Sequence, residues 1–171
     1  LEVMIDAFHL LGKAYHLDLM LVQNGSEYYK NLEKKISEIQ NVRLIPAVEF
    51  EKIIPFISGY DLGVYSLAPI SFNNQMALPN KFFEFIQARL PMVIGPSPVM
   101  VSYVEKYGIG KVTEDFGADS LAAAIRSLTK AELIAFRSNI ESAAKELSME
   151  YFEKELLQKV RKIEIKTRRL S

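Results

Sequence analysis

Short apolar runs alternate with segments of helical periodicity, and this alternation constrains the fold more than any other feature of the sequence. The runs are LDLMLV at 17–22, VRLIP at 42–46, LGVYSL at 62–67, PMVIG at 91–95 and GIGKVT at 108–113. Apolar runs without a regular polar alternation are typical of strands buried on both faces, as in parallel sheets. The helical segments between them supply the crossovers that parallel strands require. We therefore predict an α/β fold, a doubly wound, Rossmann-like parallel sheet with helices on both faces, forming one domain over residues 1–171.

Several of the helical segments carry recognisable start signals. N-caps are predicted at Ser26, Asp119, Thr129 and Ser148, and Glu132 completes a capping box with Thr129. The first helical pattern is different, because it begins at Leu1 with no capping residue before it. We interpret this start in mid-pattern as a sign that upstream sequence is not included.

Composition argues against several functional classes. Lys plus Arg and Asp plus Glu number 21 each, so no net charge attracts nucleic acid, and we predict no nucleic-acid partner. The absence of cysteine removes disulfides, thiolate metal sites and cysteine nucleophiles. The only histidines, His9 and His16, are assigned surface or packing roles, and we predict no metal site. No apolar run approaches the ~20 residues needed to span a bilayer, and we expect a cytoplasmic protein.

The connection after the third apolar run is the strongest candidate for a ligand site. Ligands of such sheets bind outside the carboxyl ends of the strands, and residues 67–79 form a long connection with little periodicity. A helix is predicted from about Pro79 to Ala88, with Pro79 suited to its first position. The free amides and the dipole of that helix start favour an anion. Lys81 adds a positive charge, and Glu84 offers two acceptor oxygens for ribose hydroxyls.

Each of these residues also has a structural interpretation. Asn80 can cap the helix without any ligand, and Lys81 and Glu84 can be ordinary solvent-facing residues. The apolar residues Phe82, Phe83, Phe85 and Ile86 are assigned to the core.

The segment ALPNKFFEFIQARLPMVIG resembles the nucleotide-sugar-binding segment of GT-B glycosyltransferases, in the large retaining group (group 1, family 4-like) that assembles bacterial polysaccharides. Members carry L-P-N-K followed by a hydrophobic residue, any residue, and a glutamate. The flanking stretches LDLMLVQNG, YDLGVYSL and YGIGKVTEDFGADSLAAAIRSL resemble neighbouring segments of the same family in the same order. The likeness runs over essentially the whole chain.

The resemblance implies the carboxy-terminal, donor-binding half of a two-domain enzyme. About five strands of the sheet would be present, whereas the first family strand, its Gly-rich loop and the N-terminal acceptor domain would be missing. Glu84 would accept the ribose hydroxyls. The diphosphate and donor sugar would face a continuous segment, made of Met76, Ala77, Leu78, Pro79, Asn80 and Lys81. Asn24 and Gly25 would border the nucleotide, and residues 46–48, Pro46 to Val48, would lie along the base edge.

The implied function is binding of a UDP- or GDP-linked sugar for a retaining, hexosyltransferase-type reaction on a glycan or lipid-linked acceptor, in polysaccharide biosynthesis. The resemblance implies no cofactor and no metal, and it assigns no catalytic residue. The chain alone would be inactive. Alternatives are a non-catalytic nucleotide-binding or interaction module of the same fold, a receiver-like signalling domain, and a sugar-nucleotide epimerase.

Three positions depart from the family pattern. Met76 stands where many relatives have a glutamate, eight positions before Glu84; Gln23 and Arg89 each replace a usual glycine. These differences leave open whether transfer activity is retained.

The basic run near the carboxyl end has two interpretations. It comprises Lys159, Arg161, Lys162, Lys166, Arg168 and Arg169. It is either a solvated helix face or a peripheral contact with anionic lipid at the inner face of a membrane.

Overall fold

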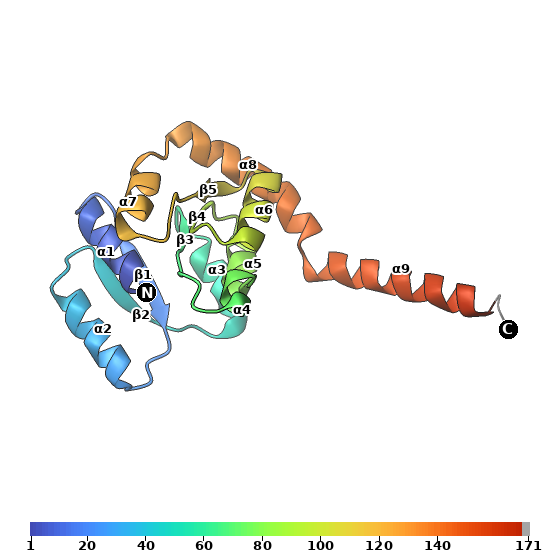
Figure 1. Cartoon of the computed structure of the whole chain (residues 1–171), viewed down its shortest axis with the longest axis horizontal. Helices are drawn as coiled ribbons and strands as arrows, with labels where there is room; N and C mark the ends of the chain where they lie inside the picture. The colour runs from blue at the N-terminus through green and yellow to red at the C-terminus, as the bar shows by residue number, and fades with distance from the viewer. Residues whose placement is uncertain (169–171) are drawn as a thin grey trace.

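The computed structural model describes residues 1–168, with side chains through Arg161, as a compact α/β body from which the last helix projects (Figure 1). The elements are α1 Glu2–Leu11, β1 Leu17–Leu21, α2 Glu27–Ser37, β2 Val42–Pro46, η1 Phe50–Lys52, α3 Ile53–Ile57, β3 Gly63–Tyr65, α4 Phe72–Gln75, α5 Asn80–Gln87, β4 Met92–Ile94, α6 Pro98–Tyr107, β5 Gly110–Val112, α7 Ala118–Arg126, α8 Lys130–Glu146 and α9 Met149–Arg168. Each predicted strand contains an observed one.

The strands are parallel, as predicted, and they form two hydrogen-bonded sheets. β1 pairs with β2 over its whole length, from Leu17 opposite Val42 to Leu21 opposite Pro46. β4 pairs with β3 on one side and with β5 on the other. The α/β class with parallel strands is therefore confirmed, although within residues 1–168 no strand of one sheet pairs with a strand of the other.

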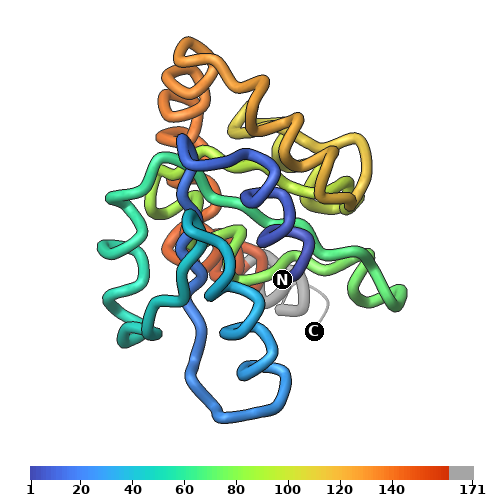
Figure 2. Tube along the Cα trace, turned by 90° about the vertical axis from the view of Figure 1, so that its left-hand side faces the viewer, coloured from blue at the N-terminus to red at the C-terminus, as the bar shows by residue number. Residues whose placement is uncertain are grey.

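Helices cover both faces of the strands, as β4 shows most clearly. Its residues Met92, Val93 and Ile94 are each 0% exposed. Val93 packs into a core with α1, α2 and α7, whereas Met92 and Ile94 pack into a second core with α5, α6 and α8. Successive side chains of a strand point to opposite faces, so one short strand serves both cores. In Figure 2, α2 lies at the lower end of the body and α8 at the upper end.

Three predicted caps are confirmed by hydrogen bonds. One of them is Ser148, whose hydroxyl accepts the N–H of Tyr151 at 3.1 Å at the start of α9. The Ser26 hydroxyl accepts the backbone N–H of Tyr29 at 3.2 Å at the start of α2. At the start of α8, the Thr129 hydroxyl accepts the N–H of Glu132 at 3.2 Å, and the Glu132 carboxylate accepts the N–H of Thr129 at 2.7 Å. This is the reciprocal bonding of a capping box.

The predicted cap at Asp119 is wrong. The N-cap of α7 is Gly117, and Asp119 lies in the first turn of the helix. Asp115 organises this turn instead, because its side chain accepts the N–H of Gly117 at 2.7 Å. The turn from Asp115 to Gly117 thus ends one residue before α7 begins at Ala118.

The connection between β3 and α5 is more ordered than its lack of periodicity suggests. It contains the single helical turn α4, which Ser71 caps by accepting the N–H of Asn74 at 3.2 Å. Pro79 is the N-cap of α5 rather than its first helical residue. Sequence boundaries of helices are uncertain by a residue or two, and Pro79 has the extended backbone of a cap.

Helix α9 extends away from the body (Figure 1). Its apolar residues Phe152, Leu156 and Val160 are exposed, between 43% and 63%. Of Ile163, Lys162, Lys166 and Arg168 only the backbone is described, and Arg169 lies outside the described residues. Within residues 1–168, no helix is both long and apolar enough to cross a bilayer.

Asn41 ties together α1, β1 and β2. It is 7% exposed, and its Nδ2 donates to the carbonyl oxygens of Phe8 at 2.7 Å and of Gly12 and Tyr15 at 2.9 Å. The backbone carbonyl of Asn41 accepts the N–H of Leu17 at 2.9 Å, at the start of β1. The last carbonyls of a helix have no partner within the helix. Asn41 therefore satisfies the end of α1 and fixes the turn that leads into the sheet.

We expect Asn41→Ala to lower the free energy of unfolding by about 1–3 kcal/mol, because it leaves buried carbonyls without a donor. Asn41→Asp should be at least as damaging, since a carboxylate would face the same carbonyls. Urea unfolding followed by circular dichroism measures both. The matched control is Gln40→Ala at the exposed neighbouring position. A change in Asn41→Ala no larger than in this control would contradict the role given to Asn41.

Asp18 connects the two sheets. Its carboxylate accepts hydrogen bonds from Arg43 Nη2 of β2 at 2.9 Å and from the Tyr60 hydroxyl, just before β3, at 2.6 Å. The Asp18 side chain is only 6% exposed. The hydrogen bond from Arg43 is the main cause that holds the pKa of Asp18 below its ordinary value of 3.8. Burial, with the nearby Asp18 carboxylate, raises the pKa of Tyr60 to about 12.

The lowered pKa of Asp18 gives a pH-dependent contribution to stability. The contribution is fully present above the ordinary pKa of 3.8 and is lost as the pH falls below it toward the lower native value. We expect Asp18→Asn to be less stable than the parent at pH 7 and the difference to shrink below pH 3.8. Urea midpoints at several pH values test this. A difference that stays constant with pH would show that Asp18 acts through packing alone.

Candidate functional site

The carboxyl ends of parallel strands place their loops at a common edge of each sheet. On the first sheet these ends are Leu21 of β1 and Pro46 of β2. On the second they are Tyr65 of β3, Ile94 of β4 and Val112 of β5. The predicted site residues follow β1, β2 and β3, so they belong to the loops of both sheets.

The start of α5 is held by apolar residues on its inner side. Phe82 and Ile86 are 2% and 0% exposed and pack into the core shared with α6 and α8. The N-cap Pro79 has φ −73° and ψ 154°, and no side chain caps the helix. The first amides of a helix lack partners within it, so α5 offers backbone donors and the positive end of its dipole.

Asn80, Lys81 and Glu84 lie outside the core that holds α5, whereas Gln87 donates to the carbonyl of Ala144 in α8 at 2.9 Å. Asn80 and Lys81 are exposed and Glu84 is half-buried. Among the residues whose side chains the structure describes, neither Lys81 nor Glu84 forms an ion pair. The helix thus presents a basic and an acidic side chain about one turn apart, beside its uncapped start.

Residues 76–79 connect α4 to α5. Met76 is 45% exposed and ends α4, whereas Ala77 and Leu78 are half-buried. Leu78 packs against the core beneath α5. This packing fixes the backbone just before Pro79, and Met76 stays at the surface.

The residues predicted after β1 and β2 are placed separately. Asn24 and Gly25 are exposed, and the Asn24 side chain accepts the N–H of Ser26 at 3.1 Å. Gly25 has φ +67°, a left-handed conformation that favours glycine. Both residues therefore shape the turn into α2. Val48 is half-buried in the connection between β2 and η1.

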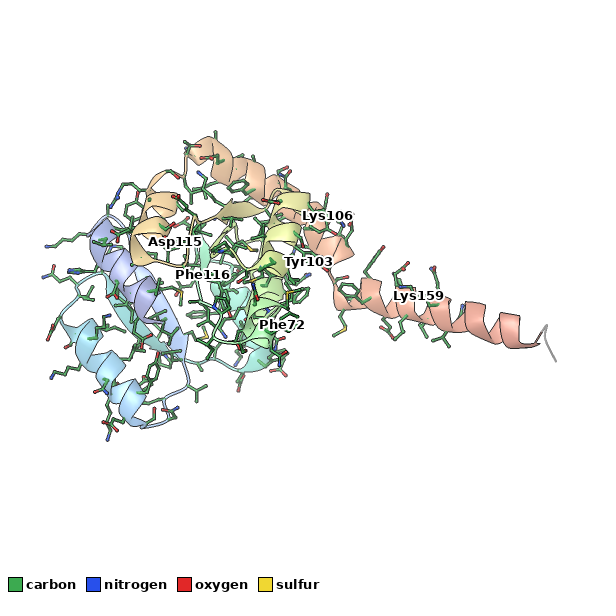
Figure 3. All side chains as sticks on the ribbon, viewed as in Figure 1. Phe72, Tyr103, Lys106, Asp115, Phe116 and Lys159 are labelled. Carbon is green, nitrogen blue, oxygen red and sulfur yellow. The ribbon has the colours of Figure 1, made fainter. Side chains whose placement is uncertain are left out.

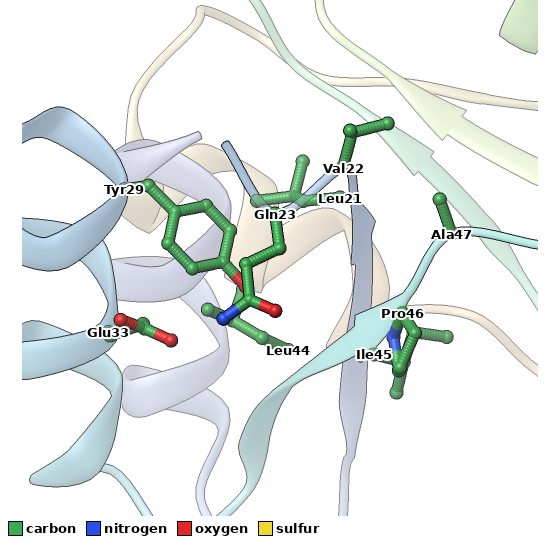
Figure 4. A pocket seen from close by; sticks show the side chains of 9 residues that line it. All are labelled: Leu21, Val22, Gln23, Tyr29, Glu33, Leu44, Ile45, Pro46 and Ala47. Carbon is green, nitrogen blue, oxygen red and sulfur yellow. The ribbon is translucent and has the colours of Figure 1, made fainter. Parts of the chain in front are cut away.

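A hollow of about 390 Å³ lies at the carboxyl ends of β1 and β2 (Figure 4). It is lined by Leu21, Val22, Gln23, Tyr29, Glu33, Leu44, Ile45, Pro46 and Ala47. Asn24, Gly25 and Val48 flank this set without lining the hollow, and no residue of α5 belongs to it. Tyr29 and Glu33 were not predicted as site residues, because Tyr29 falls in the apolar stripe of its helix with Leu32 and Ile36, and Glu33 looks like a solvent-facing position.

The ends of β3 and β4 meet the loop after β5 through tight packing. A Cβ on Gly95 would lie 2.5 Å from the Phe116 ring and 3.3 Å from the Ser66 hydroxyl. The loop is held by the Thr113 hydroxyl, which donates to the carbonyl of Asp115 at 2.6 Å. Asp115 and Phe116 lie beside the lower end of α7 in Figure 3. Sequence reasoning gave Gly95 no such role, since the contact depends on a residue 21 positions later.

The described side chains, residues 1–161, contain no group of three or more His, Asp or Glu that could hold a metal ion. The polar groups offered at the strand ends are instead the helix amides of α5, Lys81 and Glu84. Such groups can bind an anion and accept hydrogen bonds from hydroxyls.

Comparison with known proteins supports the fold. The structure is similar to a crystal structure of Anabaena Alr3699/HepE in complex with UDP and glucose, with a TM-score of 0.74 and 17% identity over 94% of this chain and 44% of that one. A second HepE structure, with UDP-glucose, has a TM-score of 0.68 at 19% identity, covering 85% of this chain and 40% of that chain. The chain has the fold of these proteins.

A further similar structure is WaaG, a glycosyltransferase involved in lipopolysaccharide biosynthesis. Its TM-score is 0.64 at 17% identity, over 88% of this chain and 40% of WaaG. The chain therefore spans less than half the length of the HepE and WaaG structures. No family model and no curated protein matches the sequence.

We expect Gly95→Ala to lower the free energy of unfolding by about 1–3 kcal/mol, because the added methyl group overlaps the Phe116 ring. The double variant Gly95→Ala/Phe116→Leu should recover part of this loss. Gly59→Ala is the control, since its Cβ would meet nothing closer than 3.8 Å. Thermal and urea unfolding measure all three. An unaffected Gly95→Ala variant would show that the loop after β5 is not held against the sheet in this way.

Proposed function

We propose that this chain is the nucleotide-sugar-binding, carboxy-terminal part of a glycosyltransferase. The observation that carries the proposal is the start of α5, an uncapped helix terminus with Asn80 and Lys81 exposed and Glu84 one turn further on. A nucleoside diphosphate needs donors for its phosphates and acceptors for its ribose hydroxyls. The α5 start offers both.

The HepE structures support this assignment, because they hold UDP with glucose in one case and UDP-glucose in the other. In the proposed complex the α5 amides and Lys81 neutralise the diphosphate, and Glu84 accepts the ribose hydroxyls. Met76, Ala77 and Leu78 lie along the donor sugar and diphosphate. Asn24, Gly25 and Val48 border the nucleotide and its base.

The same donors have a role in the reaction. Transfer of the sugar leaves negative charge on the departing diphosphate, and preorganised donors stabilise charge that develops in a transition state. The chain proposed here needs neither a metal nor a cofactor for that step. No catalytic residue is assigned to it, because the acceptor and its activating group belong to an amino-terminal domain of the same enzyme.

The finer assignments follow from the family resemblance. We propose a retaining, hexosyltransferase-type reaction with a UDP- or GDP-linked donor and a glycan or lipid-linked acceptor, in polysaccharide biosynthesis. WaaG, which acts in lipopolysaccharide biosynthesis, is consistent with such an acceptor class. The enzyme is proposed to be cytoplasmic and to touch the inner face of a membrane at its periphery.

A second candidate is a non-catalytic nucleotide-binding module of the same fold. Met76 favours it, since this exposed position carries no carboxylate to contact a donor sugar. Titration of the chain with UDP, GDP and ADP tests both candidates against the alternative that the chain binds no nucleotide. Binding of none at millimolar concentration would reject both, and donor hydrolysis or transfer by the two-domain protein would separate them.

We expect Glu84→Ala to weaken UDP binding by about 1–3 kcal/mol through loss of charge-assisted hydrogen bonds. The loss should disappear with the 2′,3′-dideoxy analogue of UDP, which has no ribose hydroxyls to donate. Isothermal titration calorimetry measures both ligands. Glu105→Ala on α6 is the control, because Glu105 is an exposed glutamate on a helix of similar length. Equal losses for UDP and the dideoxy analogue would remove Glu84 from the ribose site.

A further inference from the structure

Helix α9 carries an apolar stripe that is left exposed within the described part of the chain. The stripe consists of Met149, Phe152, Leu156 and Val160, which follow one another at spacings of three and four and so lie on one side of the helix. Their exposed fractions are 79%, 45%, 63% and 43%. The helix packs against α8 near its start and then projects from the body (Figure 1).

A helix of this kind needs a partner for its apolar side. Most of the stability of a helix in a protein comes from packing of its apolar face rather than from its own backbone bonds. Leu157, which is 49% exposed, widens the stripe on one side. Contiguous exposed apolar side chains with a charged rim mark a surface that binds another molecule.

Charged side chains border the α9 stripe, with acidic ones before its middle and basic ones after it. At about 3.6 residues per turn, Glu153 and Arg161 fall on one flank, and Glu155 and Lys159 fall on the other. Leu157 stands midway between the members of each pair. Among the side chains that the structure describes, none of these four forms an ion pair.

This arrangement is self-complementary under a two-fold axis. Such an axis between two facing helices makes them antiparallel and sets each flank against the same flank of the other copy. With the axis at Leu157, Glu153 meets Arg161 of the second copy, and Glu155 meets Lys159 of the second copy. Each contact occurs twice, and the two stripes face each other. A parallel pair in register would instead oppose like charges.

The charge balance beside the stripe favours a second helix over a lipid surface. Residues 149–161 carry three acidic side chains and three basic ones, namely Glu150, Glu153, Glu155, Lys154, Lys159 and Arg161. A helix that lies on an anionic membrane is rich in Lys and Arg over its polar face. The stripe lacks such a face, because acidic residues border its first half.

We infer that α9 pairs with α9 of a second copy of this chain, antiparallel and centred at Leu157. The two apolar stripes cover each other and supply most of the affinity. The ion pairs on the flanks select the antiparallel direction and the partner, as charged positions beside the seam do in paired helices.

Charge reversal tests this pairing. A basic variant carries Glu153→Lys and Glu155→Lys, and an acidic variant carries Lys159→Glu and Arg161→Glu. Each variant repels its own copy, whereas a mixture of the two restores every ion pair with the signs exchanged. We expect each variant alone to dimerise at least ~10-fold more weakly than the parent, and the equimolar mixture to recover the parent's affinity. Sedimentation equilibrium measures all four samples.

The control variant is Glu38→Lys/Glu105→Lys, which makes the charge change of the basic variant at exposed positions of the body. It should dimerise like the parent, and circular dichroism should show the same helix content throughout. A parent that stays monomeric would overturn the inference, as would variants that dimerise normally or a mixture that stays monomeric. Monomers that bind vesicles of phosphatidylcholine and phosphatidylglycerol through Leu156 would also overturn it and would assign the stripe to a membrane. The readout needs no nucleotide, so it stands apart from the proposed function.

Discussion

Burial of short parallel strands on both faces is the constraint on which the rest of the structure depends. β4 is the clearest case, because Met92, Val93 and Ile94 are all 0% exposed and supply two cores. Each core needs its own layer of helices, so the chain must return after every strand. This return brings the strand ends of each sheet to one edge. The start of α5 is held at that edge by Phe82 and Ile86, which leaves Asn80, Lys81 and Glu84 on the outer side.

Two glycines of the second sheet and its loops allow aromatic rings to pack closely against the backbone. A Cβ on Gly63 would lie 2.6 Å from the Phe85 ring of α5, and a Cβ on Gly95 would overlap Phe116. Because neither glycine has a side chain, the Phe85 ring lies directly against the backbone at Gly63, and the Phe116 ring lies directly against the backbone at Gly95. Gly63 thereby fixes how closely α5 sits on β3, and so where the helix terminus presents its amides and Lys81. Packing at these positions acts on the candidate site without any contact to a ligand.

The candidate site draws on both sheets, which makes their relative position important. The α5 start follows β3, whereas the hollow beside Gln23 and Pro46 follows β1 and β2. Within the described residues the sheets are joined by packing under α1 and by the hydrogen bond from Tyr60 to Asp18, but by no strand pairing.

The sequence by itself determined the elements: the five strands, the caps at Ser26 and Thr129, and the helix beginning near Pro79 all follow from local patterns. Local signals failed where distant residues compete. Asp119 looked like a cap, but Asp115 closes that turn, and the contact between Gly95 and Phe116 has no sequence signature. The roles of Lys81 and Glu84 stay predictions. Only the tertiary structure decided that the strands divide into two sheets, because pairing depends on which backbone edges meet in space and not on the strands' own residues.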